Sequence, residues 1–325
     1  PYTTLFRSAS FDNIEIDVEK LKNDMELLKE FIKVSTGREN YYNLKNLTDD
    51  VVDDEICRYM FNGNCHIDKY RVFECISNSS KLVKSAIIYG YKINYNSVLG
   101  EKIIDMIRND DEIIKTIFER SDFSELVFLT GQEINFDKFM SENQRQCIKI
   151  YYLLQNYSLT NAYSDIVNSK FKNIDNEGLS LSEIFSFGNF NLVHTLGNIN
   201  FTVIKKDLTE SQIQCVKIYG QLPDGVLSDN FTQFVSSKFS EIDKNGIPLS
   251  SLYSSKMFDL VLNLQSFDYQ IIKNDLSKEQ LQVLKMYSSI SSSKLRNKFE
   301  NYVIKHPELN IEQISDMAGI FDKIT

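Results

Sequence analysis

Several residues that catalytic motifs and membrane segments require are scarce or absent in this sequence. Its 325 residues include no tryptophan, four prolines, 12 glycines, five cysteines and three histidines. No apolar run approaches the roughly 20 residues that a bilayer-spanning helix requires, so we expect no membrane partner. None of the patterns G-x-x-x-x-G-K-S/T, G-x-G-x-x-G, G-x-S-x-G and H-E-x-x-H occurs. These absences favour a protein that is not an enzyme and uses no cofactor.

Positive charge is scarce as well. The chain has 36 basic and 45 acidic residues, which gives a formal net charge of −9. Binding to nucleic acid or to anionic membranes depends on clustered lysine and arginine. An acidic chain without a long basic run therefore predicts that nucleic acid is not the partner. The odd number of cysteines, two of them at predicted core positions, indicates reduced thiols and a cytoplasmic location.

What the sequence does contain is a repeated unit of 68 residues, written nearly three times. Its clearest part begins at positions 141, 209 and 277 with SENQRQCIKIYYLL, TESQIQCVKIYGQL and SKEQLQVLKMYSSI. A fixed period is typical of stacked arrays, in which each unit buries its apolar face against its neighbours. We therefore predict an all-α fold: an elongated, α-solenoid-like helical-repeat array with three to four helices in each 68-residue unit.

The first helix of each unit carries its own start signal and core face. A hydroxyl residue is followed three positions later by glutamine, which is the capping-box pattern. The pairs are Ser141/Gln144, Thr209/Gln212 and Ser277/Gln280. An apolar stripe at helical spacing follows in each copy. Its members are Cys147, Ile150, Tyr151 and Leu154, then Cys215, Ile218, Tyr219 and Leu222, then Val283, Met286, Tyr287 and Ile290.

The rest of the unit also repeats. A second apolar helix is followed by turns at 175–178 and 243–246, where Gly178 and Gly246 can take the left-handed conformation that ends a helix. A third apolar segment follows, and the motif Phe-x-x-Ile-Lys-x-Asp at 201–207 is the last piece of the unit, which we expect to hold three to four helices.

These patterns divide the chain into six segments. We expect an artefact at 1–8, an N-terminal helical segment at 9–79, a degenerate repeat at 80–140, repeats at 141–208 and 209–276, and a shortened C-terminal repeat at 277–325. In the N-terminal segment we expect helices over 11–33 (ended by Gly37), around 50–61 and near 69–76.

The first eight residues, PYTTLFRS, read as a cloning scar. The end of a common sequencing adapter, CCC TAC ACG ACG CTC TTC CGA TCT, translates to the same string. We therefore expect residues 1–8 to be an artefact and the native N-terminus to be missing. The alternative is a disordered tail that matches by chance.

Two groups of residues resemble metal ligands only in part. The segment from Asp175 to Glu183 has the composition of a calcium loop, but its glycine is fourth rather than sixth and its glutamate ninth rather than twelfth. Cys57, Cys65, His66 and Cys75 lack the paired spacing of structural zinc sites. We interpret the first as a helix–turn–helix connection and the second as buried, reduced cysteines. Cys65 and His66 as nucleophile and base have no identifiable third group.

One polar feature recurs at the repeat period. Lys149, Lys217 and Lys285 lie roughly opposite the apolar stripe of their helices, and Gln146, Gln214 and Gln282 precede them by one turn. In a stacked array these residues would form a Gln/Lys ladder on the outside, which is a candidate binding face for a protein partner, with an acidic partner favoured. The alternative is duplication history combined with helix propensity.

The sequence thus predicts a protein-interaction scaffold or binding module. The alternative is the targeting or oligomerising region of an enzyme whose catalytic domain lies upstream. The abundance of Ile, Lys, Asn, Ser and Tyr is typical of an AT-rich genome and suggests a bacterial or phage source.

Overall fold

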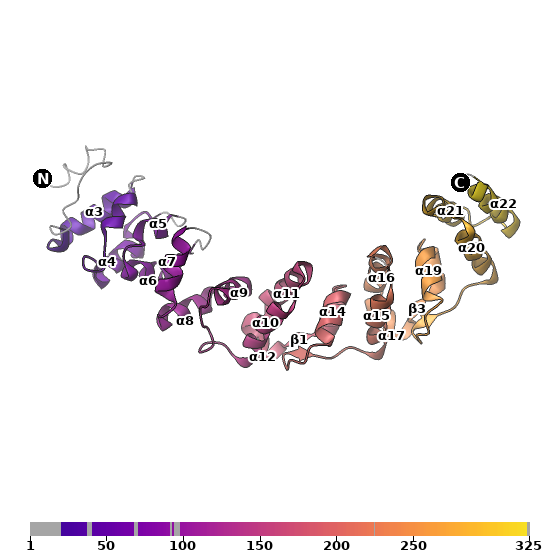
Figure 1. Cartoon of the computed structure of the whole chain (residues 1–325), viewed down its shortest axis with the longest axis horizontal. Coiled ribbons are helices and arrows are strands. Elements are labelled where there is room, and N and C mark those ends of the chain that lie inside the picture. Colours follow the sequence, from indigo (N-terminus) through magenta and orange to yellow (C-terminus); the bar gives the residue numbers. More distant parts are fainter. Residues whose placement is uncertain are drawn as a thin grey trace. The chain divides into compact units, whose positions relative to one another are not determined.

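The computed structural model describes residues 21–37, 41–67, 71–91, 93, 98–223 and 225–323. These residues are mostly α-helical, which confirms the predicted all-α class. The predicted artefact at 1–8, the start of the helix expected over 11–33 and the first residues of the helix expected over 69–76 lie outside the described residues. Contacts divide the chain into two compact units, Pro1–Ser141 and Glu142–Thr325 (Figure 1).

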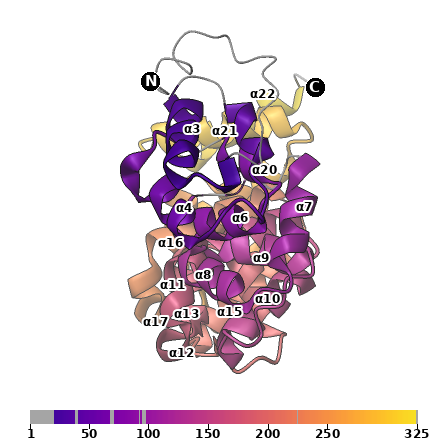
Figure 2. The same cartoon turned by 90° about the vertical axis from the view of Figure 1, so that its left-hand side faces the viewer.

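The first unit is a set of short helices. Its elements are α3 (Met25–Gly37), η2 (Tyr41–Asn46), α4 (Asp54–Tyr59), η3 (Met60–Asn64), α5 (Val72–Ile76), α6 (Ser80–Ile88), α7 (Val98–Ile107), α8 (Asp111–Arg120) and α9 (Phe123–Gly131). Helix α6 packs against α4, α5, α7 and α8, and is therefore central to this unit (Figure 2).

An aspartate interrupts one predicted helix of this unit, and an aspartate caps the later start of another. The helix expected over 11–33 is interrupted at Asp24, whose side chain accepts the N–H of Leu27 at 3.0 Å, and α3 then runs to Gly37. The helix expected over 50–61 begins after Asp53, whose carboxylate accepts two backbone N–H groups of the first turn. Both corrections follow from N-capping, which satisfies donors that a continuing helix would leave to its own carbonyls.

The second unit contains the repeats, and its first two copies have the same order of elements. The first copy is α10 (Glu142–Leu153), α11 (Tyr157–Lys170), η4 (Phe171–Asn173), α12 (Ile174–Glu177), β1 (Leu179–Ser180), α13 (Leu181–Ser186), α14 (Phe190–Gly197) and β2 (Ile204–Lys205). The second is α15 (Glu210–Gln221), α16 (Gly225–Ser237), η5 (Phe239–Glu241), α17 (Ile242–Asn245), β3 (Ile247–Pro248), α18 (Leu249–Ser254), α19 (Phe258–Leu264) and β4 (Ile272–Lys273). The third holds α20 (Lys278–Ser289), α21 (Ser293–Lys305) and α22 (Ile311–Lys323).

The predicted start signals act as capping boxes in two of the three copies. Thr209 with Gln212 and Ser277 with Gln280 make both hydrogen bonds of the motif. In the first copy, Gln144 is buried and its Nε2 donates to the Phe171 carbonyl at 3.2 Å.

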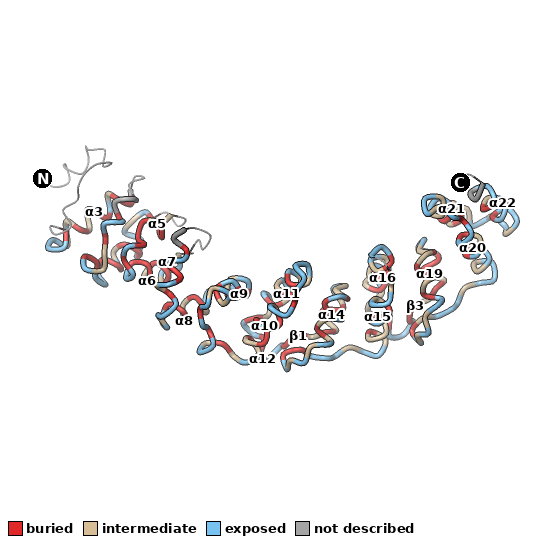
Figure 3. Tube along the Cα trace, in the orientation of Figure 1, coloured by how far each residue is buried: buried red, intermediate tan, exposed pale blue. Residues whose placement is uncertain are grey.

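Two of the three recurring tyrosines pack in equivalent surroundings, whereas the ring of the third, Tyr151, lies edge-on to Tyr152 at 5.6 Å. Tyr219 stacks on Phe190 with ring centroids 5.5 Å apart, and Tyr287 meets Phe258 edge-on at 5.3 Å. Each pair joins the first helix of one copy to the last helix of the copy before it, and α14 packs on α15 as α19 packs on α20. The buried residues face these contacts, while the outer sides of the helices are exposed (Figure 3). Copies therefore bury their apolar stripes against their neighbours.

The motif at 201–207, the last piece of the predicted unit, is not helical. Its residues Ile204–Lys205 form β2, which pairs in parallel with β1, and β4 pairs in the same way with β3. The N–H of Leu179 donates to the Val203 carbonyl at 2.7 Å. Each full copy still has four helices of six or more residues, because the third apolar segment forms two of them.

The predicted glycine turns explain how these strands begin. Gly178 and Gly246 have φ values of 61° and 64°. A Cβ atom on Gly246 would lie 2.4 Å from the carbonyl oxygen of Ile271 in the partner strand segment. Glycine is required there both for its conformation and for the close approach of the two backbones.

Candidate functional site

The structure separates two glutamines of the predicted Gln/Lys ladder, Gln146 and Gln214, from its lysines. Gln146 is 7% exposed, and its Oε1 accepts the backbone N–H of Val203 at 3.0 Å. Gln214 makes the equivalent bond to Ile271, also at 3.0 Å and also 57 residues further along the chain. These two glutamines therefore fasten the segments that lead into β2 and β4.

The expectation that Gln146 lies on the outside is thus wrong. Residues three positions apart on a helix differ by about 60° around its axis, which is enough to move one of them to a packed flank. Gln282 is exposed, and so are Lys149, Lys217 and Lys285. The role of the lysines as a binding face stays a prediction.

The residues that resemble metal ligands form an ion pair in one group and include buried or partly buried thiols in the other. Glu183 pairs with Lys170 rather than closing a loop around an ion. Burial raises the pKa of Cys57 and of Cys65, which disfavours their thiolates. Among the described residues, no three His, Cys, Asp or Glu side chains lie together as metal ligands. Also among these residues, no helix is both long and apolar enough to cross a bilayer.

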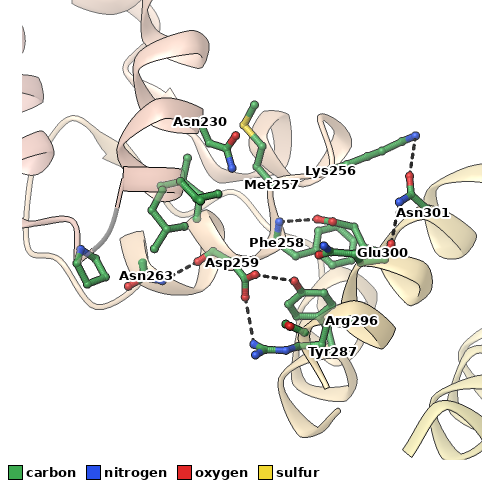
Figure 4. Close-up of a pocket in the computed structure, with 16 residues that line it drawn as sticks. Asn230, Lys256, Met257, Phe258, Asp259, Asn263, Tyr287, Arg296, Glu300 and Asn301 are labelled. Carbon is green, nitrogen blue, oxygen red and sulfur yellow. Dashed lines mark hydrogen bonds and ion pairs between the residues drawn. The ribbon is translucent and has the colours of Figure 1, made fainter. Parts of the chain in front are cut away.

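A polar cleft of about 660 Å³ lies between α16 and α21 (Figure 4). The N-terminal end of α19 and the residues before it form its floor, and Tyr287 of α20 closes one side. Four asparagines line it: Asn230, Asn263, Asn297 and Asn301. We refer to it as the α16–α21 cleft. Ligand sites in proteins commonly have volumes of about 300–1,000 Å³, so the cleft is large enough for a few residues of a partner.

Asp259 is the centre of a hydrogen-bonded group in this cleft. Its Oδ2 accepts the hydroxyl of Tyr287 at 2.9 Å, and its Oδ1 accepts Nη1 of Arg296 at 3.3 Å (Figure 4). The Arg296 guanidinium also lies 5.7 Å from the centre of the Tyr287 ring. Burial, and then the hydrogen bond to Asp259, raises the pKa of Tyr287 well above its usual range. Tyr287 therefore stays protonated and acts as a donor, not as a base.

Arg296 has donor capacity left after these contacts. Its Nε is buried and has no hydrogen-bond partner among the described residues. A guanidinium carries five N–H donors, and the bond to Asp259 uses one of them. The remaining donors suit a planar acceptor such as a carboxylate.

Glu300 connects α21 to the floor of the cleft. It is 8% exposed, and its Oε1 accepts the N–H of Phe258, the first residue of α19, at 2.7 Å. Burial raises the pKa of Glu300 to about 7, and nearby Asp259 contributes in the same direction. The bond from Phe258 and the charge of Lys256 oppose this rise.

Lys256 stands at the edge of the cleft in an unfavourable backbone conformation. Its φ is 60°, in the left-handed region that few residues other than glycine adopt. Its Nζ donates to Asn301 Oδ1 at 3.3 Å (Figure 4). One repeat earlier, the equivalent residue is Gly188, with φ of 76°.

The charged groups occur at only one of the two equivalent junctions. One repeat of 68 residues earlier, Lys256, Asp259, Arg296 and Glu300 correspond to Gly188, Asn191, Ser228 and Thr232. The repeat pattern does not indicate these residues, because it reflects only what the copies share. The sequence does show them in another way, as four positions at which one copy has a charged residue and the other does not.

Comparison of the chain with protein-family models, with curated proteins and with solved structures gave no match. The site must therefore be interpreted from its own chemistry. A cleft with a guanidinium, an ammonium, two carboxyl groups and four amides offers hydrogen bonds and charge to a polar ligand.

Proposed function

We propose that this chain is a protein-interaction module: an α-solenoid-like array of helical repeats that binds a segment of a partner protein in the α16–α21 cleft. Neighbouring copies that pack on one another support the array, as the equivalent pairs Tyr219–Phe190 and Tyr287–Phe258 do. A rigid array lowers the entropy lost on association, because the binding surface is already formed.

The observation that carries this proposal is the difference between the two junctions. At the equivalent positions of the preceding junction, Gly188, Asn191, Ser228 and Thr232 stand in place of the four charged residues of the α16–α21 cleft. A charged, partly buried group destabilises a fold unless its interactions compensate. Its presence at one junction alone favours a role in binding rather than in stacking, because stacking is common to both.

The experiment is the selection of peptides from a random display library with the intact chain. Peptides that are enriched should bind the native protein in calorimetry and should lose affinity with Asn297→Trp, which fills the cleft from an exposed position on α21. The matched control is Asp229→Trp, at the equivalent exposed position of α16. Failure to enrich any peptide, or equal loss with both variants, would contradict the proposal.

The exposed lysine row is a second candidate face within the same proposed function. Lys149, Lys217 and Lys285 lie on α10, α15 and α20, which are the first helices of their copies. Their simultaneous substitution by glutamate should leave the melting temperature unchanged. If the selected peptides bind this triple variant as well as the native chain, the row takes no part in their recognition. The cytoplasm, predicted from the odd number of cysteines, remains our proposed location.

A further inference from the structure

The α16–α21 cleft carries more information about its ligand than its size alone. Arg296 holds Asp259 through a single, long contact of 3.3 Å, although arginine and carboxylate groups usually form two parallel bonds. The buried Nε of Arg296 has no partner among the described residues. The guanidinium is therefore fixed in place by Asp259 and by the Tyr287 ring. Because its Nε is closed off from solvent, the donors that a ligand in the cleft can reach are those of Nη1 and Nη2, and Asp259 uses one of them.

Lys256 adds a second cation at the edge of the cleft. Its φ of 60° belongs to the end of α18, where the N–H groups of Lys256 and Met257 donate to the carbonyls of Tyr253 and Leu252. Gly188 ends the equivalent helix of the preceding copy with φ of 76° and without strain. The substitution of glycine by lysine brings an ammonium group to the edge of the cleft.

The balance of charge indicates how much negative charge the ligand carries. Two cations, Lys256 and Arg296, face two carboxyl groups, Asp259 and Glu300. Glu300 is buried, so its charged form is disfavoured, and the four groups together carry between zero and one positive charge. One carboxylate would balance this charge, whereas a dianionic phosphate would face Asp259 with an excess of negative charge.

The amides indicate that the rest of the ligand is polypeptide. Asparagine offers both a donor and an acceptor, which matches the N–H and C=O groups of an extended chain. Asn230 is on the α16 wall (Figure 4), and Asn297 is on the α21 wall, so a strand lying between the helices meets an amide on each side. The Asn301 amide is already used, because it accepts from Lys256 and donates to the Asn297 carbonyl.

From this arrangement we infer that the α16–α21 cleft binds an extended peptide segment through one carboxylate side chain, which Arg296 and Lys256 hold, while the asparagines bind its backbone. This inference rests on the proposed function and specifies the partner's chemistry. It also names the residues, Arg296 and Lys256, through which the chain would prefer an acidic partner.

The test is a titration of the intact, isotope-labelled chain with three short capped peptides, followed by NMR through the Arg296 side-chain Nε–H and the Phe258 backbone N–H. The peptides are Ac-Ala-Ala-Glu-Ala-Ala-NH2 and the same peptide with Gln or phosphoserine in place of Glu. We expect the Glu peptide to shift both signals and to bind at least about tenfold more tightly than the Gln peptide, because a charge-assisted hydrogen bond is roughly twice as strong as a neutral one.

Two variants distinguish loss of peptide binding from loss of folding. Arg296→Gln should reduce binding of the Glu peptide by about tenfold or more. Lys256→Gly should weaken the same binding severalfold while its melting temperature stays equal to or above that of the native chain, since glycine relieves the strained φ. A merely structural lysine would not produce loss of binding together with retained stability.

Three outcomes would overturn the inference. Equal affinity for the Glu and Gln peptides would show a peptide cleft without selectivity for acid, and would leave the proposed function intact. Tighter binding of the phosphoserine peptide would assign the cleft to dianionic ligands instead. An absence of shifts with all three peptides would also contradict the inference. The proposed function would not be contradicted by that result, because the library selection tests it separately.

Discussion

Glu300 of α21 caps the N-terminus of α19 from outside that helix, by accepting the backbone N–H of Phe258 at 2.7 Å. Met257, the residue at the N-cap position, makes no side-chain cap of its own. The bond therefore joins the third copy to the second at the floor of the α16–α21 cleft. It also places a carboxyl group where burial disfavours its charge.

The first prediction concerns the pH dependence of stability that this carboxyl produces. Its pKa is raised to about 7 in the folded chain from an ordinary 4.5, so the folded state holds the proton more tightly than the unfolded state. Stability should therefore fall as pH rises from about 4.5 to about 7 and should change little from this group above that. Glu300→Gln keeps an oxygen acceptor for Phe258 and removes the titration.

We expect Glu300→Gln to be more stable than the native chain at pH 8 by roughly 1–3 kcal/mol, with the difference disappearing near pH 5. Denaturant unfolding at the two pH values measures it. Glu312→Gln, an exposed carboxyl of α22, is the control for loss of one negative charge. A Glu300→Gln variant that is less stable at pH 8 would show that the ionised carboxylate is needed as a cap.

The second prediction distinguishes a structural glutamine from a surface one at equivalent repeat positions. Gln146→Ala removes the acceptor of the buried Val203 N–H, and we expect it to lower the free energy of unfolding by about 1–3 kcal/mol. Gln282→Ala is exposed and should change it by less than about 0.5 kcal/mol. Chemical denaturation of both variants checks this. Equal effects of the two substitutions would mean that the hydrogen bond to Val203 does not contribute to the free energy of unfolding.

The third prediction concerns the glycine turn that opens each strand. Gly246→Ala would place a Cβ 2.4 Å from the Ile271 carbonyl at a φ of 64°, so the backbones must separate and β3 must lose its pairing with β4. We expect a loss of at least about 2 kcal/mol. The matched control is Gly225→Ala in α16, where a Cβ meets no atom within 4 Å and where alanine should be neutral or stabilising by up to about 1 kcal/mol. A fully stable Gly246→Ala protein would contradict the described strand pairing.

The sequence was sufficient for the features that recur in each copy. The capping boxes at Thr209 and Ser277 and the glycines of positive φ depend on interactions between residues close in the chain, and spacing alone indicates them. The repeat period indicates the tyrosine position, although the partner ring of Tyr219 is Phe190 in the preceding copy. The strands were not predictable, because two residues are too few to show the alternation that marks a strand.

The site was not predictable for a different physical reason. Gln146 appeared to be a surface residue because its partner Val203 is 57 positions away, and its burial depends on how the copy closes on itself. Arg296, Asp259 and Lys256 come from two different copies and meet only through packing. Their signal was departure from the repeat, such as arginine in place of Ser228, and a search for periodicity passes over such departures.

The central claim is that one junction between repeats has become a binding cleft, and photo-crosslinking tests it most directly. The photoreactive residue p-benzoylphenylalanine would replace the last alanine of the Glu-containing peptide, which would be irradiated with the native chain. The account predicts that the peptide is crosslinked to residues that line the cleft, such as Asn297, and not to the equivalent surface at Asp229, as read by mass spectrometry. Crosslinks of equal yield at both places, or at Asp229 alone, would contradict it.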